Sequence, residues 1–197
     1  HDSIKNNIEK WILDNNNTFV DNIFNCYIKT ILNCPISNNS NENLYKVSIL
    51  SNFLPLIHIP QPFNQTEVNL FDCLQFTFNN WEDLEEIDYI MSDKQNNKCY
   101  SRKKNVIYKT SNVLLFYLNR TIRKDNQNIK ITKNVKIPLE LDMSDFVEEQ
   151  NQNNNYELSS IIWHGGESIK GGHYKTWAKN NNNWYLFNDS NTKEINI

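Results

Sequence analysis

The chain has 197 residues, which is the length of one domain or of part of a larger one. Its 20 Lys and Arg against 23 Asp and Glu give a net charge of −3, so no basic surplus favours general nucleic-acid binding. Apolar runs reach only about six residues, against the roughly 18 of a membrane span, so no membrane insertion is expected.

The first predicted element is a short amphipathic helix over residues 3–14. Ile4, Ile8, Trp11 and Ile12 follow one another at i, i+4, i+7 and i+8, which places them on one helical face. We expect this face to pack against the rest of the chain.

Most of the remaining chain has β character. Strands are predicted over residues 20–34 and 44–59, with a polar, Asn-rich loop over 35–43 between them. Residues 69–86 predict a helix followed by a short acidic helix or turn. The order of these segments favours an α+β fold in which β-structure dominates.

The second half continues the β pattern. A strand is predicted over residues 105–110, and the continuous apolar run VLLFYL (113–118) is typical of a strand buried on both faces. Further strands are predicted over residues 129–137 and 156–163, and the latter leads into a loop that holds the chain's 4 glycines. Antiparallel pairing is expected for most of these strands.

The chain has 4 cysteines, Cys26, Cys34, Cys73 and Cys99, and no C-x-x-C pair. A chain of this length and apolar content does not need disulfides to fold, so we expect reduced thiols in a reducing compartment. Several N-x-S/T sequons occur, but with about 36 asparagines such sequons arise by chance.

Residues 171–190 predict a β-hairpin with one histidine near its open end. If the turn comprises the four residues 179–182, Ala178 lies opposite Asn183 and His173 lies opposite Asn188. Directly opposed residues project from the same face of a sheet, about 5 Å apart. The hairpin therefore predicts an imidazole beside a carboxamide.

A histidine held by an asparagine oxygen donates one ring N–H and keeps its other nitrogen as a base. This pair is the base half of a nucleophile–His–Asn triad, with the nucleophile still to be found. Gly171 and Gly172 precede His173 and leave room for a backbone or an extended ligand to approach. The alternative interpretation is a histidine that only caps the end of a hairpin.

Residues 156–190, YELSSIIWHGGESIKGGHYKTWAKNNNNWYLFNDS, resemble the histidine box of the ubiquitin-specific proteases. In that box, Y-x-L and an apolar run lead to H-x-G, then G-H-Y, and finally an aromatic strand ending in F-[ND]-D. Further segments are similar to the family in the family's order: NNTFVDNIFNCYIKTILNC (16–34), NLFDCLQFTFNNWEDLEE (69–86), VLLFYLNR (113–120) and IPLELDMSDF (137–146). The resemblance covers essentially the whole chain.

The resemblance implies an α+β, papain-like cysteine protease fold, mainly antiparallel β fingers and palm with few helices. Residues 1–197 would be part of a single catalytic domain, with a fingers-like region over about 20–110 and a palm over 111–197. The implied activity is hydrolysis of the isopeptide or peptide bond at the C-terminal Gly of ubiquitin. The implied partners are ubiquitin and ubiquitinated proteins, without nucleic acid or membrane, in the cytoplasm or nucleus.

The resemblance also assigns roles. His173 would be the general base, Asn188 would orient it, and Asp189 would assist catalysis or position the substrate tail. The loop over residues 165–172 would border a narrow channel for that tail, and His164 would either pack the loop or contact the tail. The residues implied to bind substrate are His164, Gly171, Gly172 and Tyr174.

The sequence departs from the family pattern at the nucleophile. The family's G-N-T-C-[YF]-[ML]-N-S box is not found, so we expect the nucleophilic cysteine, and also the final palm strand, outside this chain. CYIKTIL makes Cys26 an alternative nucleophile, although no Gly-Asn precedes it. A catalytically inactive ubiquitin-binding scaffold that has lost the box is the alternative function, and a β-rich domain with a coincidental histidine box is a further one.

The family's zinc ribbon is also degenerate here. Ser37 stands where the second ligand after Cys34 is expected, and Cys99 falls on a position that is not a ligand. Scattered thiols cannot form a closed four-ligand site, so we predict no structural zinc and no cofactor. Cys73 is expected to be a small buried apolar residue.

Overall fold

The computed structural model describes residues 2–15, 18–35, 43–60, 67–84, 102–149 and 153–197. Strands dominate these ranges, and the first element is helix α1 (Asp2–Asn15), as the sequence predicts. Ile8 and Ile12 on its apolar face are buried against Tyr27 and Tyr108, forming a small cluster of their own. None of the described helices is long and apolar enough to cross a membrane.

A continuous strand was predicted over residues 20–34, but the structure has a helix followed by a strand there. Helix α2 (Phe19–Phe24) begins at a capping box in which the Asp21 backbone N–H donates to Thr18 Oγ1 at 3.1 Å. The Thr18 backbone N–H in turn donates to Asp21 Oδ2 at 2.9 Å. These two bonds satisfy backbone groups that an extended chain would leave to water, and they override the β-like pattern.

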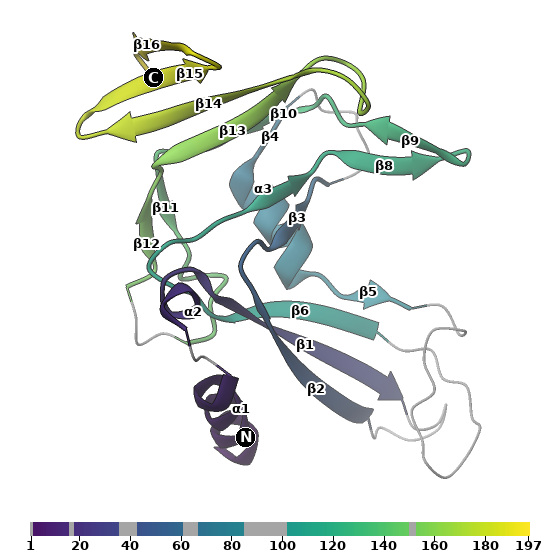
Figure 1. Ribbon diagram of the computed structural model, residues 1–197. Helices are drawn as coiled ribbons and strands as arrows, with labels where there is room; N and C mark the ends of the chain where they lie inside the picture. Colours follow the sequence, from purple (N-terminus) through teal and green to yellow (C-terminus); the bar gives the residue numbers. More distant parts are fainter. Residues whose placement is uncertain (1, 16–17, 36–42, 61–66, 85–101, 150–152) are drawn as a thin grey trace.

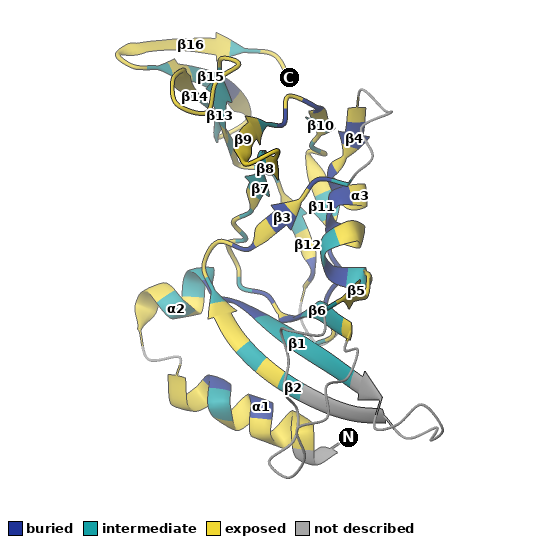
Figure 2. Cartoon of the chain, turned by 90° about the vertical axis from the view of Figure 1, so that its right-hand side faces the viewer, coloured by how far each residue is buried: buried dark blue, intermediate teal, exposed yellow. Residues whose placement is uncertain are grey.

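The first sheet has the strand order β2-β1-β6-β5 and is antiparallel throughout. Its strands are β1 (Cys26–Pro35), β2 (Asn43–Asn52), β5 (Glu82–Asp83) and β6 (Arg102–Lys109). Strand β5 replaces the acidic helix or turn predicted there, because Asp83 and Glu82 pair with Arg102 and Lys103 of β6. Helix α1 lies beside this sheet (Figures 1 and 2).

The main core lies between the two ends of the molecule. It is built on helix α3 (Leu70–Leu74), which continues as the π-helix η1 (Gln75–Asn79). Two parallel pairs flank it, β3 (Leu56–His58) with β7 (Tyr117–Asn119) and β4 (Glu67–Asn69) with β10 (Asn134–Lys136). Its buried side chains are Cys26, Ile57, Ile59, Val68, Leu70, Cys73, Leu74, Phe78, Ile107, Ile131, Met143, Phe146 and Val147.

The prediction that VLLFYL (113–118) forms a doubly buried strand is wrong. Within it only residues 117–118 belong to a strand, β7, and exposed and packed side chains alternate along the run. Leu114, Phe116 and Leu118 pack on the core, whereas Val113, Leu115 and Tyr117 are exposed. Only one side of this segment faces the core, so its composition did not reveal its burial.

Two other predicted strands are each divided. The predicted strand 129–137 falls on β9 (Gln127–Lys130) and β10, and the predicted strand 156–163 falls on β12 (Asn155–Glu157) and β13 (Ser160–Gly165). Strand β9 pairs with β8 (Thr121–Lys124), and β12 pairs with β11 (Glu140–Asp142). Each of these two continuous β patterns therefore contributes strands to two different sheets.

The second large sheet is the meander β13-β14-β15-β16. Strand β14 (His173–Asn180) lies between β13 and β15 (Asn183–Asn188), and β16 (Asn191–Ile195) forms the outer edge. This sheet and the β8–β9 hairpin lie at one end of the molecule, and the first sheet lies at the other end (Figure 1).

Candidate active site

The β14–β15 hairpin forms as predicted, but with a tighter turn. The last pair is Asn180 with Asn183, so only two residues form the turn, and Asn181 adopts a left-handed φ of 53°. Asparagine tolerates this conformation, which two-residue hairpin turns require. The predicted four-residue turn is therefore wrong, and the register differs by two residues.

A shift of two residues leaves each side chain on its original face, because the side-chain period of a strand is two. His173 and Asn188 are therefore diagonal neighbours on one face and not directly opposed, as the four-residue turn implied. Their side chains still meet: His173 Nε2 lies 2.5 Å from Asn188 Oδ1. The predicted imidazole–carboxamide pair is present.

This contact defines the protonation pattern of the imidazole. A carboxamide oxygen can only accept, so Nε2 of His173 carries the proton and donates it to Asn188 Oδ1. Nδ1 then holds the lone pair and is the basic nitrogen. The ring is half exposed at the sheet end, where a reacting group can reach it.

Asp189 completes the polar group around the imidazole. Its Oδ2 lies 3.7 Å from His173 Nε2, on the same side of the ring as the Asn188 oxygen. Asp189 has a left-handed φ of 52° in the turn that joins β15 to β16. This turn directs its carboxylate toward the histidine.

The glycine loop, residues 165–172, encloses the side chain of His164 at the end of β13. A Cβ on Gly172 would overlap both the Gly165 carbonyl oxygen and Nε2 of His164. Gly166 has a φ of 111°, which L side chains rarely adopt. A Cβ on Gly171 would meet nothing within 4 Å. Packing within the loop therefore excludes a side chain at Gly172 but not at Gly171.

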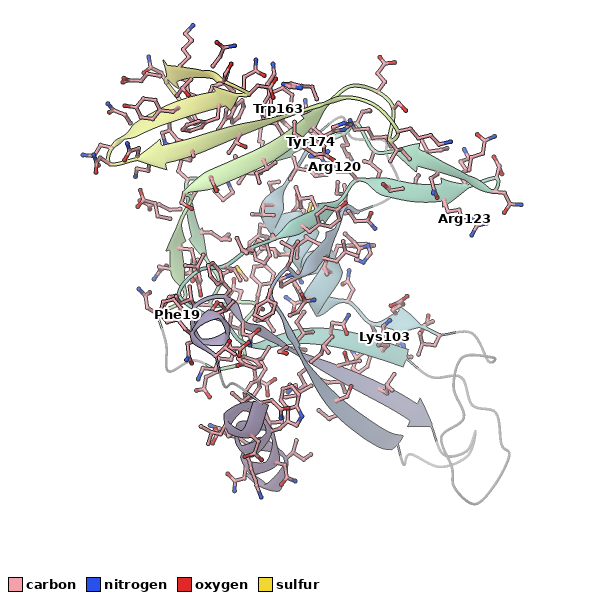
Figure 3. All side chains as sticks on the ribbon, in the orientation of Figure 1. Phe19, Lys103, Arg120, Arg123, Trp163 and Tyr174 are labelled. Carbon is pink, nitrogen blue, oxygen red and sulfur yellow. The ribbon has the colours of Figure 1, made fainter. Side chains whose placement is uncertain are left out.

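His164 packs into this loop from β13. Its ring centroid lies 4.7 Å from that of Tyr174, and its Nδ1 lies 3.0 Å from Lys130 Nζ. Figure 3 shows Trp163 and Tyr174 in the sheet β13-β14-β15-β16. It also shows Arg120 nearby, at the base of the β8–β9 hairpin. The predicted packing role of His164 fits these contacts, whereas its contact with a substrate tail stays a prediction.

Lys130 is the residue that sequence reasoning missed. It lies 34 residues before His164, in a different strand pair, and no motif or periodicity relates the two positions. Only the packing of the β8–β9 hairpin beside the end of β13 brings them together.

Neither cysteine whose side chain is described is suited to be the nucleophile. Cys26 and Cys73 are fully buried in the core, and burial raises the pKa of Cys26 to about 12 and that of Cys73 to about 11. A nucleophilic thiol needs the opposite shift and access to solvent. The alternative of Cys26 as nucleophile is therefore rejected, and Cys73 is the small buried residue that was predicted.

The predicted degenerate zinc ribbon involves Cys34, Ser37 and Cys99. The side chain of Cys34 and both other residues lie outside the described residues, so the prediction of no structural zinc stays a prediction. In the part of the chain that the structure describes, no three His, Cys, Asp or Glu side chains gather as a metal site.

A family model described as "Ubiquitin carboxyl-terminal hydrolase" matches residues 2–197. The chain belongs to this family. It is 28% identical over 195 residues to human ubiquitin carboxyl-terminal hydrolase 3, covering 92% of this chain and 36% of that protein. It is 31% identical over 167 residues to ubiquitin carboxyl-terminal hydrolase 9 of Arabidopsis thaliana, covering 81% of this chain and 18% of the relative.

Solved structures of a ubiquitin-bound DUB module agree with the fold. The SAGA Ubp8/Sgf11/Sus1/Sgf73 DUB module bound to ubiquitin aldehyde superposes with a TM-score of 0.71 at 25% identity, over 99% of this chain and 44% of that chain. A second structure of this module, bound to monoubiquitin, gives a TM-score of 0.73 at 25% identity, over 98% and 43% of the two chains. The fold is the α+β, papain-like fold of the ubiquitin-specific proteases.

The chain spans only about a third of the length of the human relative and less than half of the solved chains. The division into a fingers-like region and a palm stays a prediction.

Proposed function

We propose that the protein containing this chain is a thiol-dependent deubiquitinase that hydrolyses the bond after the C-terminal Gly of ubiquitin. In this proposal, His173 is the general base and Asn188 orients it. The observation that carries the proposal is the 2.5 Å contact between His173 Nε2 and Asn188 Oδ1. The family match and the ubiquitin-bound solved relatives support ubiquitin as the substrate.

In this proposal, each ring nitrogen of His173 has its own role. Nε2 is engaged with Asn188, so Nδ1 of His173 would accept the proton of the nucleophilic cysteine thiol. The thiolate attacks the terminal Gly carbonyl carbon, the C–N bond breaks, and the imidazolium returns its proton to the leaving amine. Water then hydrolyses the thioester with His173 again as the base.

Asn188 and Asp189 serve different parts of this cycle. The carboxamide keeps the ring in one tautomer and one orientation, as the orienting member of a triad does. The Asp189 carboxylate, with Oδ2 3.7 Å from Nε2, would assist catalysis or position the substrate tail. The glycine loop, with Gly171, Gly172 and Tyr174 at its end, would border the Gly-Gly tail.

The test is turnover of a ubiquitin substrate with a fluorogenic C-terminal amide by the full-length protein. His173→Ala should lower kcat by about 10⁴-fold or more, because the thiol loses its base. His58→Ala, the same substitution at an exposed histidine on β3, is the matched control and should leave kcat unchanged. Asn188→Asp should retain more activity than Asn188→Ala, because it keeps an acceptor for Nε2.

A ubiquitin probe with a C-terminal electrophile separates the two functions considered. Labelling of one cysteine supports the enzyme. Ubiquitin binding without labelling or turnover in the wild-type protein would reject the enzyme and favour the non-catalytic scaffold. Full activity of His173→Ala would remove the assigned base.

A further inference from the structure

Lys130 joins two sheets beside the glycine loop. It is the last residue of β9, and its ammonium donates to three acceptors at the end of β13. These are Nδ1 of His164 at 3.0 Å, the His164 carbonyl oxygen at 3.1 Å and the Gly166 carbonyl oxygen. An ammonium has three N–H donors, so this site uses all of them.

The ammonium is a specific connection between two elements that share no strand pairing. In the described residues, β9 pairs with β8, and β13 pairs with β14. The hairpin itself is secured at its base, where the Ile131 backbone N–H donates to the Arg120 carbonyl oxygen at 2.7 Å. Arg120 also donates to the Lys133 carbonyl oxygen. Lys130 therefore projects from a secured base toward the loop.

The contact with Lys130 selects one tautomer of His164. An ammonium can only donate, so Nδ1 of His164 is the acceptor and Nε2 carries the ring proton. Nε2 lies so near the position of a Cβ on Gly172 that the two atoms would overlap, and the ring also packs against Tyr174. The contacts thus run from Lys130 through His164 to Gly172, the residue before His173.

We propose that Lys130 is a positioning residue, whose ammonium holds the His164 ring and the Gly166 carbonyl so that the glycine loop keeps the shape needed to receive the substrate tail. This inference rests on the proposed function. Lys130 contacts the loop and not the imidazole of His173, so it acts on tail binding more than on proton transfer. It is not a catalytic residue.

The first test is exchange of backbone amide hydrogens for deuterium in the full-length protein. Lys130→Met keeps an apolar stem and removes all three donors. It should increase deuterium uptake in peptides from residues 164–172, because two carbonyls and one ring lose their common donor. Lys124→Met, at the exposed far end of β8, is the matched control and should leave these peptides unchanged. Unchanged uptake in Lys130→Met would overturn the proposal.

The second test is steady-state turnover of the ubiquitin substrate. Lys130→Met should raise KM about tenfold or more with kcat within about twofold, since misplaced binding groups weaken tail capture. Combined with His164→Ala, the loss should be smaller than the product of the two single losses, because both act on one loop. A fall in kcat alone, or independent multiplication of the two losses, would overturn the positioning role.

The two tests separate this inference from the proposed function. If the wild-type protein does not turn over ubiquitin, the proposed function fails, and with it the role in tail binding. Amide exchange in that case still decides whether Lys130 holds the loop.

Discussion

The two four-stranded sheets of this protein are both antiparallel, but they are stabilised in different ways. In the sheet β2-β1-β6-β5, the inner strands bury Cys26, Tyr27, Ile107 and Tyr108 against two apolar clusters. In β13-β14-β15-β16, whose residues are all described, Trp184 is the only buried residue of the strands. Figure 2 shows the same contrast, with the strands of the second sheet coloured almost entirely as exposed or intermediate.

The two sheets contribute differently to the stability of the fold and to the candidate active site. The first sheet and the α3–η1 core supply most of the buried apolar surface, which is the main favourable term in folding. The second sheet is held by strand pairing and by polar contacts at its edge, and it carries the candidate active site. Substitutions in the core should therefore change the free energy of unfolding, and substitutions in the loop should change turnover with little loss of stability.

The largest expected effect is on the core. Phe78 is 2% exposed on η1, and Phe78→Ala should lower the free energy of unfolding by about 3–5 kcal/mol through lost burial and a cavity. Urea unfolding of the full-length protein measures this value. Phe53→Ala is the matched control, since Phe53 is 46% exposed and its loss should cost far less. Equal costs for the two would break the comparison.

The glycine loop provides the opposite case. Gly172→Ala places a methyl group against the His164 ring and the Gly165 carbonyl, so the loop must move. We expect kcat/KM for the ubiquitin substrate to fall about a hundredfold, as for a misplaced binding group, with a small change in unfolding free energy. A methyl group on Gly171 meets no protein atom within 4 Å, so amide exchange over residues 164–172 should increase in Gly172→Ala and stay unchanged in Gly171→Ala. If both variants behaved alike, loop packing would not be the cause.

The buried thiol of Cys26 predicts that the free energy of unfolding depends on pH. Burial raises its pKa from 9.0 to about 12, so the folded state keeps the thiol protonated where the unfolded state ionises. Stability is therefore full below pH 9 and declines between pH 9 and 12, by about 1 kcal/mol at pH 10 from this group. Cys26→Ala should show a weaker decline in unfolding free energy over this range, although it is less stable at neutral pH. An equally steep decline would contradict this assignment.

The smallest expected effect concerns the start of α3. The Asp72 backbone N–H donates to Asn69 Oδ1 at 2.7 Å, so Asn69→Ala should lower the free energy of unfolding by about 1 kcal/mol. Thermal unfolding measures the loss. Asn128→Ala, on the exposed strand β9, is the control and should change stability by less than half of that. A neutral Asn69→Ala would show that core packing alone positions α3.

Local pattern determined a substantial part of this protein. The spacing of Ile8 and Ile12 was enough for α1, and the two aromatic strands were enough for the hairpin that carries His173. The His173–Asn188 pair was predicted despite a wrong turn, because a two-residue shift keeps both side chains on one face. Asn188 and His173 are 15 residues apart, so a single hairpin brings them together.

Tertiary structure decided the features that depend on distant segments. The capping box of α2 overrode a β-like pattern, and the core covered only one side of VLLFYL. The burial of Cys26, the enclosure of the His164 ring by Gly172 and the attachment of Lys130 to the loop all require separate elements to pack together. Sequence periodicity shows which face of an element is apolar, but it does not show which other element packs against that face. The packing of distant elements is what places the glycine loop beside the imidazole of His173.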